Sequence, residues 1–298
     1  MKNKPKLAFS LIELSVVILI IGILVIGVTK GKKVLDSARL ASARSLTKNS
    51  PVNLNSENLG FWLETTSEKS FNVAEAVDGA AVSTWYDTKL SAFGSPVNVT
   101  ASGTSRPLYI ASATNGLPTL RFDGINDRMF NGSVAGSSMT KDGNQMTIFA
   151  VHKYYSPDHN TAIYFWGNGL ATLHAKWGDA ALDFDFGGCC SSATRIQFIP
   201  PSTFSNRTNI ISAVRRTNAS GAVRINGTQY GSAAASIMNA TIDTSVIAGL
   251  EIGNQNGGLP AHIDINELII FKTALTDNEI KDIEKYLSDK WGVPLTGL

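Results

Sequence analysis

An uninterrupted apolar segment near the N-terminus constrains the fold more than any other feature of the chain. Between Phe9 and Thr29 the only charged residue is Glu13. As an α-helix these residues would extend about 31 Å at 1.5 Å per residue, which matches the hydrocarbon core of a bilayer. Lysines flank the segment on both sides. The pattern predicts a long hydrophobic helix rather than part of a water-soluble fold.

Three interpretations of this segment compete. A cleaved secretory signal needs a shorter apolar core and a small-residue cut site directly after it, whereas lysines follow here. An uncleaved membrane anchor explains the length but not the charge of Glu13. Because a carboxylate in lipid is costly, Glu13 indicates a function of its own.

The residues around Glu13 resemble the cleavage and methylation signal of type IV prepilins, on the run Ala8-Phe9-Ser10-Leu11-Ile12-Glu13-Leu14. The resemblance implies that a prepilin peptidase cuts between Ala8 and Phe9, and that the new N-terminal Phe9 is N-methylated. It also implies that Glu13 neutralises the α-amino group of Phe9 on a neighbouring subunit, since opposite charges are buried more readily as a pair. Ala8 stands where the family usually has glycine.

The resemblance also predicts the organisation and location of the chain. Residues 1–8 form the leader and residues 9–50 the hydrophobic helix. A linker follows at 51–58, and a head occupies 59–298. Charge alone does not fix the orientation, because the lysines on the two sides oppose each other. The family implies a subunit in the inner membrane with its head outside the cytoplasm, then on the cell surface in a pilus with other pilin subunits.

The charge distribution excludes one class of partner. Residues 1–50 carry nine Lys/Arg and two acids, so about +7, and the remainder carries 17 basic and 22 acidic residues, so about −5. A nucleic-acid-binding domain needs a clustered basic surface, which the bulk of the chain lacks. We therefore predict no nucleic-acid partner.

The rest of the chain has the pattern of a β-rich head. Asn226-Gly227 is typical of a two-residue hairpin turn, and 276–290 has a helical pattern. Short strand-like runs separated by polar turns predict a mainly β fold, an antiparallel jelly-roll sandwich. The predicted strands are 60–63, 117–122, 146–152, 162–166, 180–186, 210–214, 223–225, 246–252 and 263–271.

The head resembles the laminin-G-like, concanavalin-A-like domains of bacterial surface proteins, over roughly 59–293. The resemblance is strongest at the strand 263–271 and the helix that follows it. It implies two antiparallel sheets and, often, carbohydrate or matrix binding. It does not identify one ligand, since a fold does not define a function.

The run His262-Ile263-Asp264-Ile265-Asn266-Glu267 also resembles the catalytic strand of retaining glucanases. That strand carries two carboxylates on one face. Here His262 stands at the nucleophile position, so we predict that the protein is not an enzyme. Glu267 shares its parity with the apolar Ile263 and Ile265, so strict alternation would bury it. Either a bulge intervenes, or Glu267 is buried with a partner, for which we expect an arginine.

Asp183 and Asp185 lie on one face of a strand whose other face is apolar. Two carboxylates at this spacing could begin a structural Ca²⁺ site, and no other cofactor is predicted. The alternative is a solvated strand face. Trp166 and Trp177 flank Gly/Asn-rich loops, where either ring could stack on a sugar.

Cys189 and Cys190 are the only cysteines and are adjacent. A vicinal disulfide would close a strained ring, and two free or externally paired thiols are equally open.

Together these features predict a pilin-like or pseudopilin-like surface subunit with a lectin-like adhesive head. The alternatives are a singly membrane-anchored carbohydrate-binding protein and a pseudopilin of a type II secretion system.

Overall fold

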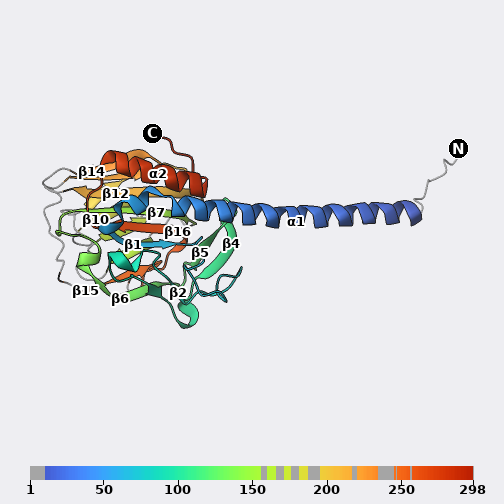
Figure 1. The fold of residues 1–298 in the computed structure, drawn as a ribbon, viewed down its shortest axis with the longest axis horizontal. Helices are drawn as coiled ribbons and strands as arrows, with labels where there is room; N and C mark the ends of the chain where they lie inside the picture. The colour runs from blue at the N-terminus through green and yellow to red at the C-terminus, as the bar shows by residue number, and fades with distance from the viewer. Residues whose placement is uncertain are drawn as a thin grey trace, which may run out of the picture.

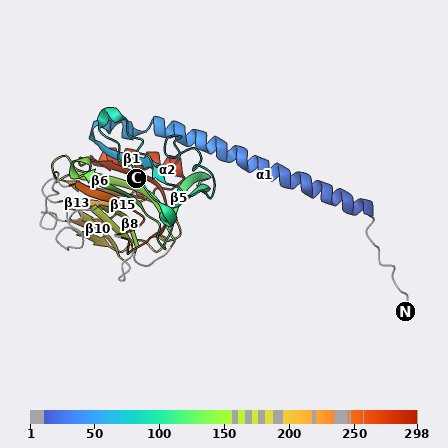
Figure 2. The ribbon, with the colours of Figure 1, turned by 90° about the horizontal axis from the view of Figure 1, so that it is seen from below.

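The computed structural model describes residues 11–155, 160–165, 171–175, 181–186, 195–216, 220–233, 245, 247–255 and 257–297. The chain begins with one long helix, α1 (Leu11–Lys48), whose first part projects from a rounded head like a rod (Figures 1 and 2). α1 ends three residues before Pro51, which cannot continue a helix, and a 3₁₀ helix follows, η1 (Pro51–Asn58).

The head contains two antiparallel sheets. In the first sheet the strand order is β14-β13-β12-β7-β16-β5-β4, and β1 also pairs with β16. Its strands are β1 (Leu59–Glu64), β4 (Leu108–Thr114), β5 (Leu117–Asp123), β7 (Met146–Tyr154), β12 (Thr208–Arg216), β13 (Ser220–Ile225), β14 (Thr228–Ala233) and β16 (His262–Phe271).

The second sheet has the strand order β11-β10-β9-β8-β15-β6-β3-β2. Three short 3₁₀ helices lie in connections, η2 (Ser91–Phe93), η3 (Gly103–Ser105) and η4 (Gly136–Ser138). The strands of this sheet are β2 (Thr84–Trp85), β3 (Val99–Thr100), β6 (Met129–Ala135), β8 (Asn160–Phe165), β9 (Ala171–Ala175), β10 (Leu182–Phe186), β11 (Arg195–Phe198) and β15 (Ile247–Ile252).

The strand β16 organises the first sheet. One edge of β16 pairs with β7 along almost its whole length, while the other edge pairs first with β5 and then with β1. Its register against β7 shifts between Ile265 and Glu267, so Asn266 forms a bulge. The bulge reverses the alternation. Ile265 and Leu268 both face the core between the sheets, and Glu267 is turned to the other side.

That other side of the first sheet is covered by two helices. The helix α2 (Asp277–Trp291) begins with a capping box between Thr276 and Glu279, and Gly292 ends it in the left-handed conformation at φ 65°. α2 lies beside the last turns of α1 across this face (Figure 1). The resulting second core contains the apolar residues Ala43, Val52, Trp62, Phe149, Ile269, Phe271, Ile283, Leu287 and Trp291.

The prediction of an antiparallel, mainly β sandwich behind one long N-terminal helix is confirmed. All nine predicted strands and the C-terminal helix are present within the described residues. Within the same residues, no helix combines the length and the apolarity that crossing a membrane requires.

Candidate functional site

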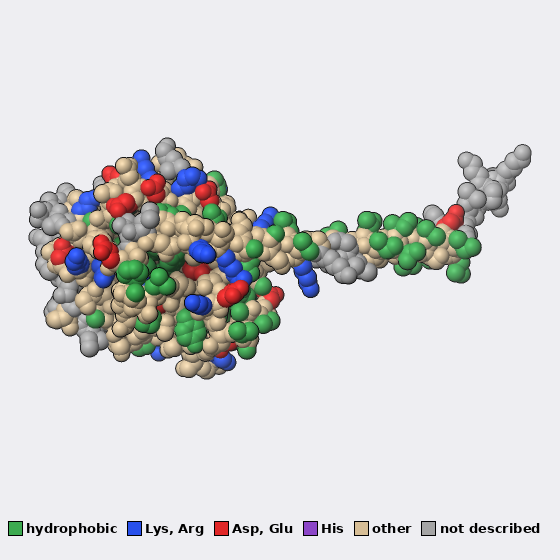
Figure 3. All heavy atoms as spheres, in the orientation of Figure 1, with side chains coloured by type: hydrophobic (Ala, Val, Ile, Leu, Met, Phe, Trp, Pro, Cys, Tyr) green, Lys and Arg blue, Asp and Glu red, His purple; other side chains and the backbone are tan. Residues whose placement is uncertain are grey.

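The projecting part of α1 exposes apolar side chains along its length. Figure 3 shows them as a hydrophobic rod beside a head of mixed polarity. Leu11, Ile12 and Val28 are 86%, 73% and 72% exposed, and Glu13 is exposed among them. An apolar surface of this extent marks a contact with a membrane or with other protein. Ala8 and Phe9 lie outside the described residues.

The C-terminal part of α1 is fixed to the head by polar contacts. The Arg44 Nε donates to the carbonyl oxygen of Thr66 at 2.8 Å, and Asp36 accepts from the Ser112 hydroxyl at 3.0 Å. Ala43, only 2% exposed, packs into the second core. The projecting part of α1 is therefore held in one direction relative to the head.

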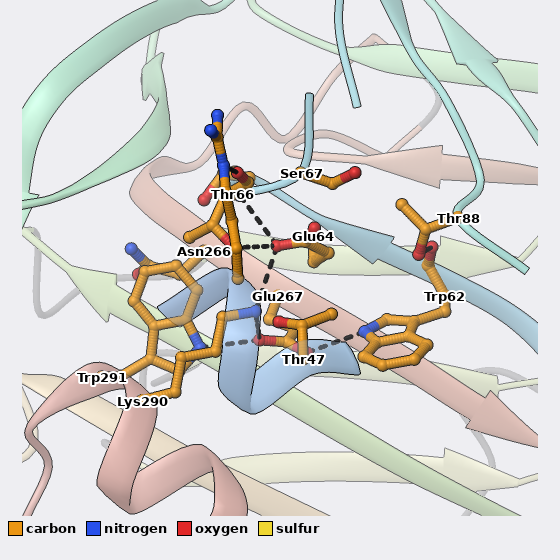
Figure 4. Close-up of polar contacts among 12 residues, drawn as sticks. Thr47, Trp62, Glu64, Thr66, Ser67, Thr88, Asn266, Glu267, Lys290 and Trp291 are labelled. Atoms are coloured by element: carbon orange, nitrogen blue, oxygen red, sulfur yellow. Dashed lines mark hydrogen bonds and ion pairs between the residues drawn. The ribbon is translucent and has the colours of Figure 1, made fainter. Parts of the chain in front are cut away.

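Where α1, α2 and the first sheet meet, Glu267 is 1% exposed, accepts three hydrogen bonds and forms an ion pair with Lys290 (Figure 4). The Trp62 Nε1 and the Tyr286 hydroxyl donate to its Oε1 at 2.7 and 2.9 Å. The Trp291 Nε1 and the Lys290 Nζ lie 2.7 and 2.9 Å from its Oε2. Burial and the charge of Glu267 raise the pKa of Tyr286 well above its ordinary value.

A second carboxylate completes this cluster. Glu64, at the end of β1, is fully buried, and its Oε2 lies 3.0 Å from the Lys290 Nζ. The Thr66 backbone N–H donates to the same oxygen at 2.8 Å. Burial by itself lowers the pKa of Lys290, but Glu267 and Glu64 outweigh it, and the pKa lies above its ordinary value. One lysine thus joins β1, β16 and α2.

This cluster corrects one sequence expectation. The bulge and the burial of Glu267 are both present, but the partner is Lys290 and not an arginine. Lys290 lies four residues after Tyr286 on the buried face of α2, so it reaches Glu267 from the helix. Glu64 and Glu267 are buried beneath the two helices and closed to a substrate. Through Lys290 they connect β1 and β16 to α2. His262 is exposed and stacks on Tyr155, with ring centroids 4.7 Å apart.

Asp183 and Asp185 lie on β10 and are 3% and 0% exposed, so the expected solvated strand face is wrong. The reason is Arg195 on the neighbouring β11. Its Nε and Nη2 donate to the two carboxylate oxygens of Asp185 at 2.8 and 3.0 Å, and its Nη1 lies 3.4 Å from Asp183 Oδ2. The His174 Nε2 lies 3.9 Å from Asp185 Oδ2, and burial lowers the pKa of His174.

The structure does not decide the predictions of a Ca²⁺ site, a sugar-stacking tryptophan and a disulfide. In the described ranges, no group of three or more His, Cys, Asp and Glu side chains could hold a metal ion. Trp166, Trp177, Cys189 and Cys190 lie outside the described residues. The Ca²⁺ hypothesis at Asp183 and Asp185 and the sugar-stacking and disulfide hypotheses at these four positions stay predictions.

His152 is a buried titratable group that the sequence does not distinguish from other core residues. It faces the core between the sheets and is 1% exposed, and its ring lies 4.6 Å from that of Tyr154. Neither ring nitrogen has a hydrogen-bond partner in the structure as described. Burial lowers the pKa of His152 to about 3, so it is neutral at physiological pH.

Comparison with known families identifies the N-terminal segment. Residues 3–29 match the family described as the prokaryotic N-terminal methylation motif. The predicted prepilin-type motif is therefore confirmed, and it supports processing as a type IV pilin or pseudopilin. No curated protein sequence matches the chain.

Comparison with solved structures agrees with the β-sandwich fold of the head. The botulinum neurotoxin serotype D binding domain matches with a TM-score of 0.54 and 12% identity, over 83% of this chain and 56% of that one. Its ligand binding domain in complex with N-acetylneuraminic acid matches with a TM-score of 0.52 and 13% identity, over the same shares. A Trypanosoma rangeli sialidase matches with a TM-score of 0.47 and 11% identity, over 78% of this chain and 33% of the sialidase. The chain thus spans about half the length of the botulinum chains and a third of the sialidase. At this identity the likeness shows the fold alone.

Proposed function

We propose that this protein is a subunit of a type IV pilus-like surface filament that assembles through α1 and displays a lectin-like binding head. The observation that carries the proposal is the methylation motif at residues 3–29, which runs directly into an exposed apolar helix. The rigid attachment of that helix to the head supports the proposal, because a filament needs every head in one orientation.

In this proposal the prepilin peptidase removes residues 1–8 and methylates Phe9. The exposed apolar face of α1 lies in the inner membrane before assembly and packs against α1 of other copies afterwards. Glu13 receives the α-amino group of Phe9 from a neighbouring subunit. The pairing offsets the cost of burying either charge alone in the filament interior.

The head in this proposal is outside the cell and recognises carbohydrate. Its β-sandwich supports this role, together with the N-acetylneuraminic acid bound by one botulinum chain of the same fold. We do not propose glycan hydrolysis, because the two carboxylates on β1 and β16 are closed to solvent and already hydrogen-bonded.

The mass of the N-terminal peptide of protein isolated from its own membrane tests the proposal. We expect a peptide that begins at Phe9 and carries one additional methyl group. A strain without prepilin peptidase is the control, and it should yield a peptide beginning at Met1. The same Met1 peptide from the normal strain would contradict the filament proposal and favour a singly anchored carbohydrate-binding protein. Co-isolation with secretion components instead of filaments would favour a type II pseudopilin.

A further inference from the structure

The head contains a pocket of about 470 Å³ that no sequence motif indicates. Two lysines line it, Lys89 and Lys272, together with the Phe93 ring and serines from β6 and η4. Gly60 allows η4 to close one wall, since a Cβ there would lie 2.2 Å from the Ser138 carbonyl oxygen. The volume is in the range of small-molecule sites.

The charge of this Lys89/Lys272 pocket is positive. The Lys89 Nζ is partly neutralised, because it donates to the Gly60 carbonyl oxygen at 2.6 Å and lies near Asp87. In the described structure, Lys272 has no ion pair at all. Burial lowers the pKa of Lys89, Asp87 opposes this, and the positive charge of Lys272 adds to the lowering.

The Asp87 carboxylate beside Lys89 is already occupied by backbone N–H groups. Asp87 Oδ1 accepts the backbone N–H groups of Trp62 and Lys89 at 2.9 Å each, and its Oδ2 accepts that of Val97 at 2.8 Å. These bonds hold the carboxylate in place, and Asp87 is not among the residues that line the pocket. An anion in the pocket would provide the negative partner that the Lys272 ammonium lacks in the described structure.

The rest of the lining carries hydroxyl groups. In the described structure, the hydroxyls of Ser95, Ser133, Ser137 and Ser138 make no hydrogen bond within the chain, and all four line the pocket. Phe93 and Pro96 provide an apolar wall beside them. Hydroxyl groups, an apolar wall and an unpaired ammonium match a ligand with hydroxyls, an apolar face and a carboxylate.

We propose that the Lys89/Lys272 pocket binds a carboxylate-bearing saccharide, with Lys272 on the carboxylate and the serine hydroxyls on the sugar hydroxyls. This inference rests on the proposed role of the head as a carbohydrate-binding domain and specifies its ligand class. Because the attraction is partly electrostatic, binding should weaken as salt increases.

The test uses the full-length protein in detergent, titrated with N-acetylneuraminic acid and followed by saturation-transfer difference NMR. Lys272→Glu should weaken binding about tenfold or more, the effect of losing one charge-assisted hydrogen bond. Lys272→Gln removes the positive charge without reversing it and retains most of the aliphatic stem. This variant should also weaken binding, and it keeps the test valid if Lys272→Glu fails to fold. Lys69→Glu, at an exposed lysine with no ion pair in the described structure, is the matched control and should bind as the parent does.

Glucose and inorganic phosphate complete the test. Equal binding of glucose, or unchanged binding by both Lys272 variants, would overturn the proposal. Binding of phosphate without binding of the acidic sugar would do the same, because it would show an anion site without sugar recognition. Failure here leaves the mass of the N-terminal peptide unaffected, so it is distinguishable from failure of the filament proposal.

Discussion

The two parts of α1 have opposite relations to the rest of the molecule. In the projecting part Leu11 is 86% exposed, whereas Ala43 in the docked part is 2% exposed. The docked part finds its apolar partners in α2 and the first sheet, and the projecting part has the same need for apolar partners. The difference teaches that one helix can serve two roles: the head completes the docked part of α1, and in the proposed filament other subunits complete the projecting part.

Two carboxylates show the same contrast. Glu267 is buried, and four donors from β1 and α2 satisfy it within the chain. Glu13 is exposed among apolar side chains on the projecting part of α1. In the proposed filament Glu13 reaches the same kind of environment as Glu267, with a donor from another subunit.

The largest expected effect is on assembly. Glu13→Ala should abolish filaments, because the Phe9 amine of a neighbour would be buried without its partner, at about 3–5 kcal/mol for each contact. Electron microscopy of sheared surface fractions measures this. Glu57→Ala, at an exposed carboxylate of η1, is the control and should assemble normally. Normal filaments from Glu13→Ala would contradict the proposed pairing of Glu13 with the Phe9 amine of a neighbouring subunit.

Within the head, Lys290→Met should lower the free energy of unfolding by about 3–5 kcal/mol, because it leaves Glu64 and Glu267 buried without their cation. Urea unfolding of the full chain in detergent, followed by tryptophan fluorescence, measures the loss. Lys285→Met is the matched control on the same helix. It removes an exposed ion pair with Asp289 and should cost about 0.5 kcal/mol or less. Equal losses of unfolding free energy in the two variants would show that the buried cluster does not stabilise the packing of α2 on the sheet.

The docking of α1 can be tested with a pair of alanines two residues apart. Ala43→Leu should destabilise the head by about 1–3 kcal/mol, because it overfills the second core. Ala41→Leu, at an exposed position of the same helix, should change stability by about 0.5 kcal/mol or less. The same urea unfolding compares them. No difference between the variants would mean that α1 is loosely attached.

The smallest effect is a pH dependence of stability from His152. Its pKa is lowered to about 3 in the folded state. Unfolding therefore takes up a proton below the ordinary pKa of about 6.5, and stability falls as pH decreases. Between pH 7.5 and 5.5 this amounts to about 1.4 kcal/mol. In His152→Leu that fall should be absent, whereas an unchanged fall would place the proton uptake elsewhere. Urea midpoints at the two pH values measure it.

The sequence predicts best what depends on neighbouring residues. The methylation motif is contiguous, and strands such as β7 and β16 have a clear pattern of apolar residues along the sequence. β4 and β6 escape prediction because exposed small or polar residues interrupt their pattern. At Asn266 the alternation of β16 reverses. Periodicity alone could not decide there between a bulge and a buried, paired Glu267.

The sites in the head depend on contacts that sequence spacing does not encode. Lys290 reaches Glu267 from a helix 23 residues later in the chain, and Arg195 meets Asp185 across two strands. The Lys89/Lys272 pocket combines segments that lie far apart in the sequence. Only the folded topology brings these side chains together.

The hydrogen bond between Thr47 and Tyr286 joins the first helix to the last. A ribosome makes these residues at opposite ends of synthesis, so α1 has no complete seat until the final residues have emerged and folded. A chain shortened before Tyr286 would lose this bond and the last turns of α2, and α1 would be held to the head only by earlier contacts such as those of Arg44 and Asp36. In the proposed filament, only a subunit made through α2 would present α1 with all of its contacts to the head in place.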